Sequence, residues 1–485
     1  MYFRPGPGAG LKSYWRVTAM AVVPLLSACS SLQPLSTPPP ADNPLLTALA
    51  TEQALNSADS TPSGWWQTFA DAQLNQLVDS ALRHNYSLQA SLARLQSSAA
   101  LVRQQDSDLY PSVDLNAGKN RSWRRDSSSD QWSAGLTASY ELDFWGALAA
   151  SRDQAGFNLY SSQAAARLQA NTVAAQVAGA WFGYVKEQRQ LVLLEQQQQR
   201  IDAGLTVINA RFQRGRAQVS DVWQQQTLLE SINSDVIQAR ASRDIYYQQL
   251  QLWLGDSAPV AGQDGAQLPD IHDAHSQVTL AAVSQRPDVQ RAWYEVQAAY
   301  AGVAVAEAAR YPRFTLSASY TGQAPQLEDV FDNWMANLAA NLVLPLIDGG
   351  QRRAQLDARQ ATLDATLAEY QQSLLAAAQE VQQQLVRERE QQALAGSINR
   401  RLLLARKNEA FQSSRYAKGV GDFLSLLTAQ REVLALERQL LANQFSAVQT
   451  RIALYQAVSH GRFSATETAV NTFSSAAQTQ DNSHL

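Results

Sequence analysis

The sequence predicts a membrane protein of the α+β class, in which long antiparallel coiled-coil helices are joined to four β-strands per chain. Three observations lead to this prediction. The chain repeats its motifs at an offset of about 200 residues, each copy contains two segments of alternating apolar and polar residues, and each copy contains a long proline-free stretch. Only 17% of the 485 residues are charged, which suits long helices with uncharged polar faces.

The chain begins with a predicted signal sequence and lipid-attachment site. Three basic residues precede an apolar run at 17–26, as in a secretory signal. That run is about half of the ~20 residues that a membrane-spanning helix needs. Residues 26–29, Leu-Ser-Ala-Cys, resemble a bacterial lipobox, so we predict cleavage after residues 1–28 and lipidation of Cys29, the only cysteine. An ordinary cleaved signal beside an unrelated cysteine is the alternative.

The mature chain is predicted to hold a tether and two copies of one unit. Residues 29–63 are rich in Ser, Thr and Pro, which is typical of an extended tether. Tyr110-Pro111 recurs as Tyr311-Pro312, and an Arg-aromatic-x-x-Gly motif recurs at nearly the same offset. We therefore predict a first repeat at 64–260, a second at 261–458 and a tail at 459–485.

Two strands are expected in each repeat, where apolar and polar residues alternate. The segments are 113–117 and 132–144 in the first copy, and 314–320 and 334–344 in the second. A half-buried soluble sheet would alternate too, but the length, the aromatic ends and the predicted lipid anchor favour transmembrane strands. Four strands cannot close a barrel, which needs at least about eight. Open edges are not tolerated in lipid, so we expect an oligomer.

A very long helix and a returning helix are expected after each strand pair. The stretches 146–215 and 350–419 contain no proline, and each has room for a rod of roughly 100 Å. Their apolar residues follow coiled-coil spacing. A soluble coiled-coil protein is the alternative, but it would not explain the strands. The predicted seam residues are Ile201, Leu205, Ile208, Phe212, Leu363, Leu367, Tyr370, Leu374, Ala377, Val381, Leu441, Phe445, Val448, Ile452 and Tyr455.

The composition argues against several function classes. A net charge of −4 gives no basic balance for nucleic acid. The five histidines are scattered without metal-ligand spacing, and no Ser-His-Asp or paired-carboxylate arrangement stands out. We predict no catalytic residue, no cofactor and no metal site, and we expect that the protein is not an enzyme.

Motifs in order along the mature chain resemble the TolC superfamily, and within it the OprM-like outer-membrane efflux lipoproteins. Each motif alone is weak, but their order is specific. The resemblance implies a homotrimer whose strands form a shared twelve-stranded β-barrel and whose helices form a tunnel through the periplasm. The motifs are Trp65-Trp66-x-x-Phe69, Tyr110-Pro111, Tyr140 to Gly146, Arg286-Pro287-Asp288 and Leu344 to Gly350.

The resemblance implies the outer-membrane channel of a tripartite efflux system. Such a channel is a passive exit duct for drugs or other small molecules, delivered by an inner-membrane RND-type transporter through a periplasmic adaptor protein. The chain would be lipid-anchored in the outer membrane through Cys29. One alternative is the exit duct of a type I protein-secretion system, and another is a structural periplasm-spanning lipoprotein without a pore. The lipobox and Arg286-Pro287-Asp288 favour efflux, and the polar faces of the strands argue against the poreless alternative.

A periplasmic gate is also implied, at the turns between the long and returning helices. Asp221 matches the family aspartate that hydrogen-bonds across subunits to a tyrosine, here Tyr416, and Leu424 matches an apolar constriction. Many members carry a cation-binding acidic ring nearby. Here those positions hold Ser425 and Thr428, so the existence of such a ring is left open.

Three features have more than one interpretation. Arg211 and Arg415 suit either helix capping or gating, because cations are favoured at helix C-termini. Trp65 and Trp66 are expected to be packing anchors. A basic loop is expected at 119–125, and it is expected either to face lipopolysaccharide or to be solvated.

Overall fold

The computed structural model describes residues 64–255, 267–271 and 280–459. The predicted signal sequence, Cys29, the tether, the boundary between the repeats at residue 260 and nearly all of the predicted tail lie outside these residues. The chain forms two compact units. The sheet unit contains residues 100–158 and 294–367, and the helical unit contains the other described residues. Each unit combines segments of both repeats.

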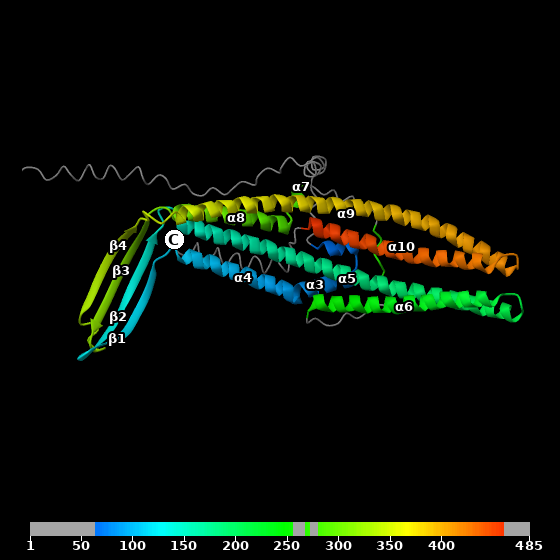
Figure 1. Ribbon diagram of the computed structural model, residues 1–485, viewed down its shortest axis with the longest axis horizontal. Coiled ribbons are helices and arrows are strands. Elements are labelled where there is room, and N and C mark those ends of the chain that lie inside the picture. The colour runs from blue at the N-terminus through cyan, green and yellow to red at the C-terminus, as the bar shows by residue number, and fades with distance from the viewer. Residues whose placement is uncertain (1–63, 256–266, 272–279, 460–485) are drawn as a thin grey trace, which may run out of the picture. The chain divides into compact units, whose positions relative to one another are not determined.

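The order of the elements matches the predicted repeat (Figure 1). A strand pair precedes each long helix, and a shorter helix returns beside it. The elements are η2 (Trp65–Phe69), α3 (Ala72–His84), α4 (Tyr86–Ser107), β1 (Ser112–Arg124), β2 (Ser127–Leu142), α5 (Ala147–Gln213), α6 (Val219–Leu254), α7 (Leu280–Ser284), α8 (Pro287–Ala308), β3 (Arg313–Ala324), β4 (Trp334–Val343), α9 (Gln351–Ala417) and α10 (Phe423–Val458).

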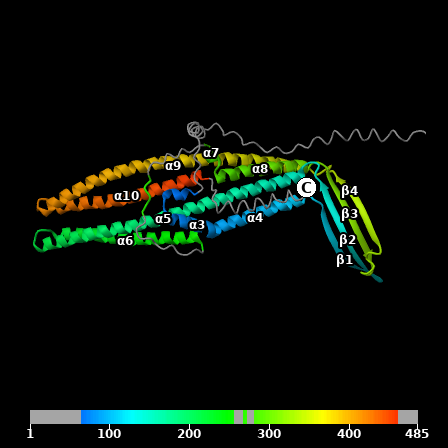
Figure 2. The same cartoon turned by 180° about the vertical axis from the view of Figure 1, so that it is seen from behind.

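The two long helices have the same length, and so do the two returning helices. Helices α5 and α9 have 67 residues each, and α6 and α10 have 36 each. This symmetry confirms the internal repeat and the long antiparallel helices (Figure 2). Among the residues that the structure describes, no helix combines the length and the hydrophobicity that crossing a bilayer would require.

The predicted seams are largely buried. Ile201 and Ile208 of α5 are buried, as are Leu374 and Val381 of α9. Phe212 is the exception, because it lies in the last turn of α5, where fewer helices cover it. Helices α5 and α6 also need a glycine to approach each other. A Cβ at Gly183 would lie 2.4 Å from the ring of Tyr246.

The first segment of the helical unit is fixed by aromatic packing. Trp65 is fully buried, and its ring stacks on Tyr455 with 5.8 Å between centroids. The Trp65 indole N–H donates to Asn171 Oδ1 at 3.1 Å, which satisfies the one polar atom of a buried indole. Trp66 is buried beside it. The expectation that the two tryptophans are packing anchors is confirmed.

The four strands form one antiparallel sheet in the order β1-β2-β3-β4. All four predicted strands are present, but β1 is much longer than its apolar alternation. It pairs from Ser112 with Ser139 to Arg124 with Ser127, across a turn at 125–126. The basic loop expected at 119–125 is therefore wrong, because residues up to Arg124 belong to β1. The backbone ladder continues where the side chains become polar, and alternation detects only the apolar part.

The two faces of the sheet differ in chemistry. The apolar face is solvent-exposed in the single chain, with Leu115 75% exposed and Leu338 80% exposed. The opposite face is polar, and its side chains bond between strands. Asn116 donates to Thr137 at 2.8 Å, for example. The apolar face contains Val113, Leu115, Leu136, Tyr140, Leu316, Tyr320, Leu338 and Leu342.

Candidate gate at the helical turns

Both long helices end in the same kind of turn. Gly215 and Gly419 have φ of 69° and 74°, a left-handed conformation that glycine adopts without steric cost. In the first turn the N–H of Arg216 donates to the carbonyl of Arg211 at 2.9 Å, and the second turn repeats this bond from Val420 to Arg415 at 3.1 Å. These bonds close a Schellman-type helix end. The repeated Arg-aromatic-x-x-Gly motif thus encodes the reversal of the chain.

The returning helices begin at caps that use the nearby carboxylates. Gln218 caps α6 in a capping box, in which Asp221 Oδ2 accepts the N–H of Gln218 at 3.1 Å. Asp422 caps α10 and accepts the N–H of Ser425 at 2.8 Å and its hydroxyl at 2.7 Å. The hydroxyl and N–H of Ser425 hold the pKa of Asp422 below its usual value. Both carboxylates also lie where the helix dipole favours negative charge.

Arg211 links the two turns within one chain. Its guanidinium donates to the carbonyls of Tyr416 and Ala417 at 2.8 and 2.9 Å, and lies 4.5 Å from the centroid of the Tyr416 ring. Arg211 therefore caps the end of α9 and not the end of its own helix. Arg415 donates to the carbonyl of Val420 at 3.1 Å, inside its own turn. Arg211 therefore has a capping role, but at the other long helix, whereas Arg415 bonds a carbonyl of the turn beyond its own helix. Sequence reasoning missed both partners.

Tyr416 lies between Arg211 and the core of this end of the helical unit. Its ring is 5.7 Å from the ring of Phe423, and it packs against a cluster from α5, α6 and α10. The hydroxyl oxygen of Tyr416 is buried and has no hydrogen-bond partner within the described part of the chain. A buried hydroxyl without a partner is costly. Among the described residues, the structure thus leaves one hydroxyl donor at these turns without an acceptor.

The other predicted gate residues lie around the same turns. Leu424 is 61% exposed in the first turn of α10, and the hydroxyl of Thr428 donates to the Leu424 carbonyl at 2.8 Å. Within the described residues, Asp221 makes no hydrogen bond to Tyr416. The bond implied by the resemblance is between subunits, so the single chain does not test it. The same residues contain no cluster of three or more His, Cys, Asp or Glu side chains suited to a metal ion.

A buried polar network crosses the helices above the turns. Gln197 of α5 is fully buried and donates to Glu437 of α10 at 3.0 Å. Arg200 and Arg406 reach the same carboxylate at 2.8 and 3.0 Å. Burial alone raises the pKa of Glu437, but the hydrogen bonds from Gln197 and the arginines together lower it below the usual value. Sequence reasoning missed this network, although a glutamine four residues before Ile201 was a usable signal on an apolar seam.

The Arg286-Pro287-Asp288 motif has a structural role in this chain. Arg286 is buried and donates to the carbonyl of Ala457, at the end of α10, at 3.0 Å. It also pairs with Asp288 and with Glu380 of α9, at 2.8 Å each. The motif therefore joins the start of α8 to α9 and to the end of α10.

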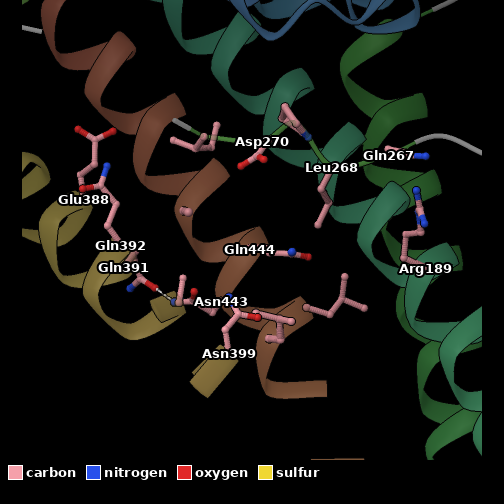
Figure 3. A pocket seen from close by; sticks show the side chains of 16 residues that line it. Arg189, Gln267, Leu268, Asp270, Glu388, Gln391, Gln392, Asn399, Asn443 and Gln444 are labelled. Atoms are coloured by element: carbon pink, nitrogen blue, oxygen red, sulfur yellow. Dashed lines mark hydrogen bonds between the residues drawn. The ribbon is translucent and has the colours of Figure 1, made fainter. Parts of the chain in front are cut away.

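A cleft of about 700 Å³ lies among α5, α9, α10 and residues 267–271 (Figure 3). Its wall mixes polar and apolar side chains, and several of the polar side chains have partners in the chain. Asn443 donates to Gln391, and Glu388 forms a buried ion pair with Arg451. We assign no ligand to this internally paired network.

Comparison with known proteins gives relatives over nearly the whole chain. The chain is 25% identical to the probable outer membrane lipoprotein SilC of Salmonella typhimurium over 463 residues, which covers 92% of this chain and 98% of that protein. It is 28% identical to the outer membrane protein OprJ of Pseudomonas aeruginosa over 446 residues, covering 87% and 90%. Both alignments run through the repeats, the sheet and the turns.

Solved structures share the fold. A crystal structure of CusC superimposes with a TM-score of 0.80 at 22% identity, covering 88% of this chain and 99% of that one. The Campylobacter jejuni CmeC outer membrane channel also gives 0.80, at 20% identity, covering 92% and 98%. The family described as "Outer membrane efflux protein" matches residues 77–256 and 280–460, once in each repeat. With both repeats matched and the fold shared, the chain belongs to the outer membrane efflux protein family.

Proposed function

We propose that three copies of the chain form the outer-membrane duct of a tripartite efflux system. The observation that carries the proposal is the four-stranded sheet, which has two open edges and an exposed apolar face. An open edge in lipid leaves backbone groups without hydrogen bonds. Pairing β1 of one subunit with β4 of the next removes all open edges, and three subunits then supply twelve strands.

The dimensions of the sheet suit an outer membrane. Aromatic side chains gather at both ends of the apolar face, as they do at the two interfaces of membrane barrels. From Trp132 to Phe144 the chain spans roughly 30 Å at ~3.3 Å per residue and a tilt of ~40°. The apolar band of such barrels is ~25 Å tall. The aromatic groups are Trp132, Tyr320 and Trp334 at the hairpin end, and Phe144, Trp145 and Phe314 at the helical end.

The direction of the duct follows from the chain order. The helices connect to one end of the strands, and the two hairpin connections lie at the other. In the proposed assembly the helices extend into the periplasm, and the hairpins face the outside. Lipidation at Cys29 adds a second membrane attachment, as the Leu-Ser-Ala-Cys sequence predicts.

The partners are proposed from the relatives. One relative is named a solvent efflux pump outer membrane protein and another a cation efflux system protein. We propose a periplasmic adaptor and an inner-membrane RND-type transporter as partners of this chain, with no cofactor and no catalytic step in the duct itself. The names of these two relatives refer to different cargoes.

The gate is proposed at the two turns. The Tyr416 hydroxyl is buried and has no acceptor among the described residues of its own chain. In the proposed trimer the Tyr416 ring turns outward, and Asp221 of a neighbouring subunit accepts the hydrogen bond. Three such bonds around a ring would hold the tunnel closed at rest. The exposed Leu424 side chain would add an apolar constriction that resists wetting.

Cysteine cross-linking at the sheet edges tests the assembly. Asn116→Cys on β1 would be combined with Asn337→Cys or Asn341→Cys on β4, all on the polar face. Because β1 and β4 are opposite edges of one sheet, a disulfide between them is expected only between subunits. Oxidation should give dimers and trimers in mild detergent, and Asn116→Cys alone should give none. A monomeric mass for the wild-type protein in mild detergent would refute the duct.

A further inference from the structure

Near the turn of the β1–β2 hairpin, the apolar face of the sheet becomes basic. Cross-strand pairing puts Lys119 opposite Trp132 and Arg121 opposite Asp130, in the same alternation as Leu115 opposite Leu136. Successive side chains of a strand point to opposite faces. Lys119 and Arg121 therefore lie on the apolar face, which in the proposed duct faces the membrane and not the lumen.

These cations lie at and just beyond the aromatic group at the hairpin end. Lys119 lies directly opposite Trp132, and Arg121 lies two residues farther along β1 toward the hairpin turn. Trp334 of β4 pairs with Gly322 of β3, which pairs with Ala134 of β2. Trp334 is therefore within two residues of the level of Trp132. Tryptophan marks the headgroup level of a membrane interface. The two cations are therefore placed among the headgroups of the outer leaflet.

Aromatic rings hold both cations on this face. The Lys119 ammonium lies 4.8 Å from the centroid of the Trp132 ring, and the Arg121 guanidinium lies 5.8 Å from that of Trp123. Trp123 itself is 73% exposed. Cation–π contacts of this kind orient a basic group without neutralising it. The rings therefore hold the two basic groups in place without cancelling their charge.

One carboxylate serves both cations. Asp130 lies 3.4 Å from the Lys119 ammonium and 3.3 Å from the Arg121 guanidinium, and both distances exceed those of a charge-assisted hydrogen bond. The face therefore keeps an excess of positive charge. This face combines an exposed apolar surface, two tryptophans at the interface and surplus positive charge. It is therefore complementary to a lipid that carries both acyl chains and phosphate.

We propose that Lys119 and Arg121, with Trp123 and Trp132, bind the phosphate-bearing headgroup of an outer-leaflet glycolipid on the outer surface of the duct. The inference rests on the proposed orientation of the sheet in the membrane. It gives Lys119 and Arg121, which have no role in the proposed transport, a role in binding lipid.

Binding of fluorescently labelled bis-phosphorylated lipid A to the purified full-length trimer, measured by anisotropy in mixed micelles, tests the proposal. The test variant is K119Q/R121Q. The matched control is R124Q/R125Q, which removes the same charge from the polar face and the turn of the same hairpin. Each cation near an anionic surface contributes roughly fivefold in affinity, so the test variant should bind about twentyfold more weakly. The control should change affinity by less than about threefold, in line with general screening.

Two further arms identify the ligand. Lipid A without phosphates should bind the wild type as weakly as it binds the test variant. Inorganic phosphate at matched ionic strength should displace no more lipid than chloride does, because free phosphate lacks the acyl chains. Equal loss in the two variants, or undiminished binding of phosphate-free lipid, overturns the proposal.

Channel recordings on the same preparations separate this inference from the proposed function. Both variants should retain the trimer mass, and K119Q/R121Q should also retain the wild-type conductance, because its two substitutions lie on the apolar face, away from the lumen and the helical turns. If conductance is normal and the lipid affinities of the two variants are equal, the lipid site is wrong and the duct stands. If the wild type forms no channel, the duct itself is wrong.

Discussion

The two helical turns have the same backbone but different side-chain connections. Gly215 and Gly419 both adopt positive φ, and both turns close with the same hydrogen bond. Arg211 reaches across to the end of α9, whereas Arg415 stays within its own turn. The two repeats thus share the reversal of the chain, but only the first turn donates hydrogen bonds to the end of the other long helix. We call this contact of Arg211 with the Tyr416 and Ala417 carbonyls the clamp. We expect that the second turn moves only after the Arg211 hydrogen bonds to the Tyr416 and Ala417 carbonyls break.

The largest expected effect comes from breaking this clamp. Arg211→Ala removes two charge-assisted bonds to carbonyls at the end of α9, which we expect to cost about 2 kcal/mol locally. Amide exchange over residues 414–420 should then quicken by about thirtyfold.

Arg415→Ala is the matched control, because it removes the equivalent residue of the other repeat. It should quicken exchange by less than about fivefold, since only one bond inside the turn is lost. Equal acceleration in the two variants would contradict the clamp.

The next effect concerns the bond proposed between subunits. Tyr416→Phe removes the buried hydroxyl and keeps the ring against Phe423. An interaction of roughly 1.5–3 kcal/mol per contact is lost, so single-channel conductance should rise.

Asp221→Ala should raise conductance too, and the double variant should add little. Asp221 also belongs to the cap of α6, so amide exchange over the first turn of α6 is measured in the Asp221→Ala variant to separate loss of the cap from loss of the bond between subunits. Wild-type conductance in both Tyr416→Phe and Asp221→Ala would mean that these residues are only structural.

A smaller effect is expected from pH. Asp422 caps the second returning helix, and its pKa is lowered by the hydroxyl and N–H of Ser425. A carboxyl with a depressed folded-state pKa contributes stability above its unfolded pKa of about 3.9, and loses it as the pH falls through the folded value.

The corresponding cap of the first turn is Gln218, which does not titrate. Below about pH 4, amide exchange at the start of α10 should quicken in the wild type, and it should be pH-independent in Asp422→Asn after correction for intrinsic rates. An unchanged pH response in that variant would rule out Asp422 as its cause.

Cation block is expected to be the weakest effect. The resemblance places Ser425 and Thr428 at the positions of an acidic ring, and their hydroxyls donate to Asp422 and to the Leu424 carbonyl. Divalent or trivalent cations added on the periplasmic side should therefore block only weakly. Strong block at micromolar concentrations would mean that another carboxylate lines the pore, with Asp422 as the first candidate.

Sequence reasoning predicted the features that repeat along one element. The strands followed from alternation and the long helices from seam spacing, because each depends on residues close together in the chain. The outer half of β1 was missed, since Lys119 and Arg121 occupy positions that alternation expects to be apolar. The contact of Arg211 with Tyr416 was missed for another reason. It depends on how two hairpins pack, and no local pattern encodes that packing.

We propose above that the chain forms a passive duct that is held shut at its two turns. Single-channel recording of the purified full-length trimer in planar bilayers tests this most directly, with wild type and Tyr416→Phe compared at equal incorporation. We expect small, discrete channel steps for the wild type and clearly larger steps for Tyr416→Phe. Incorporated trimer that never conducts in either form would contradict it.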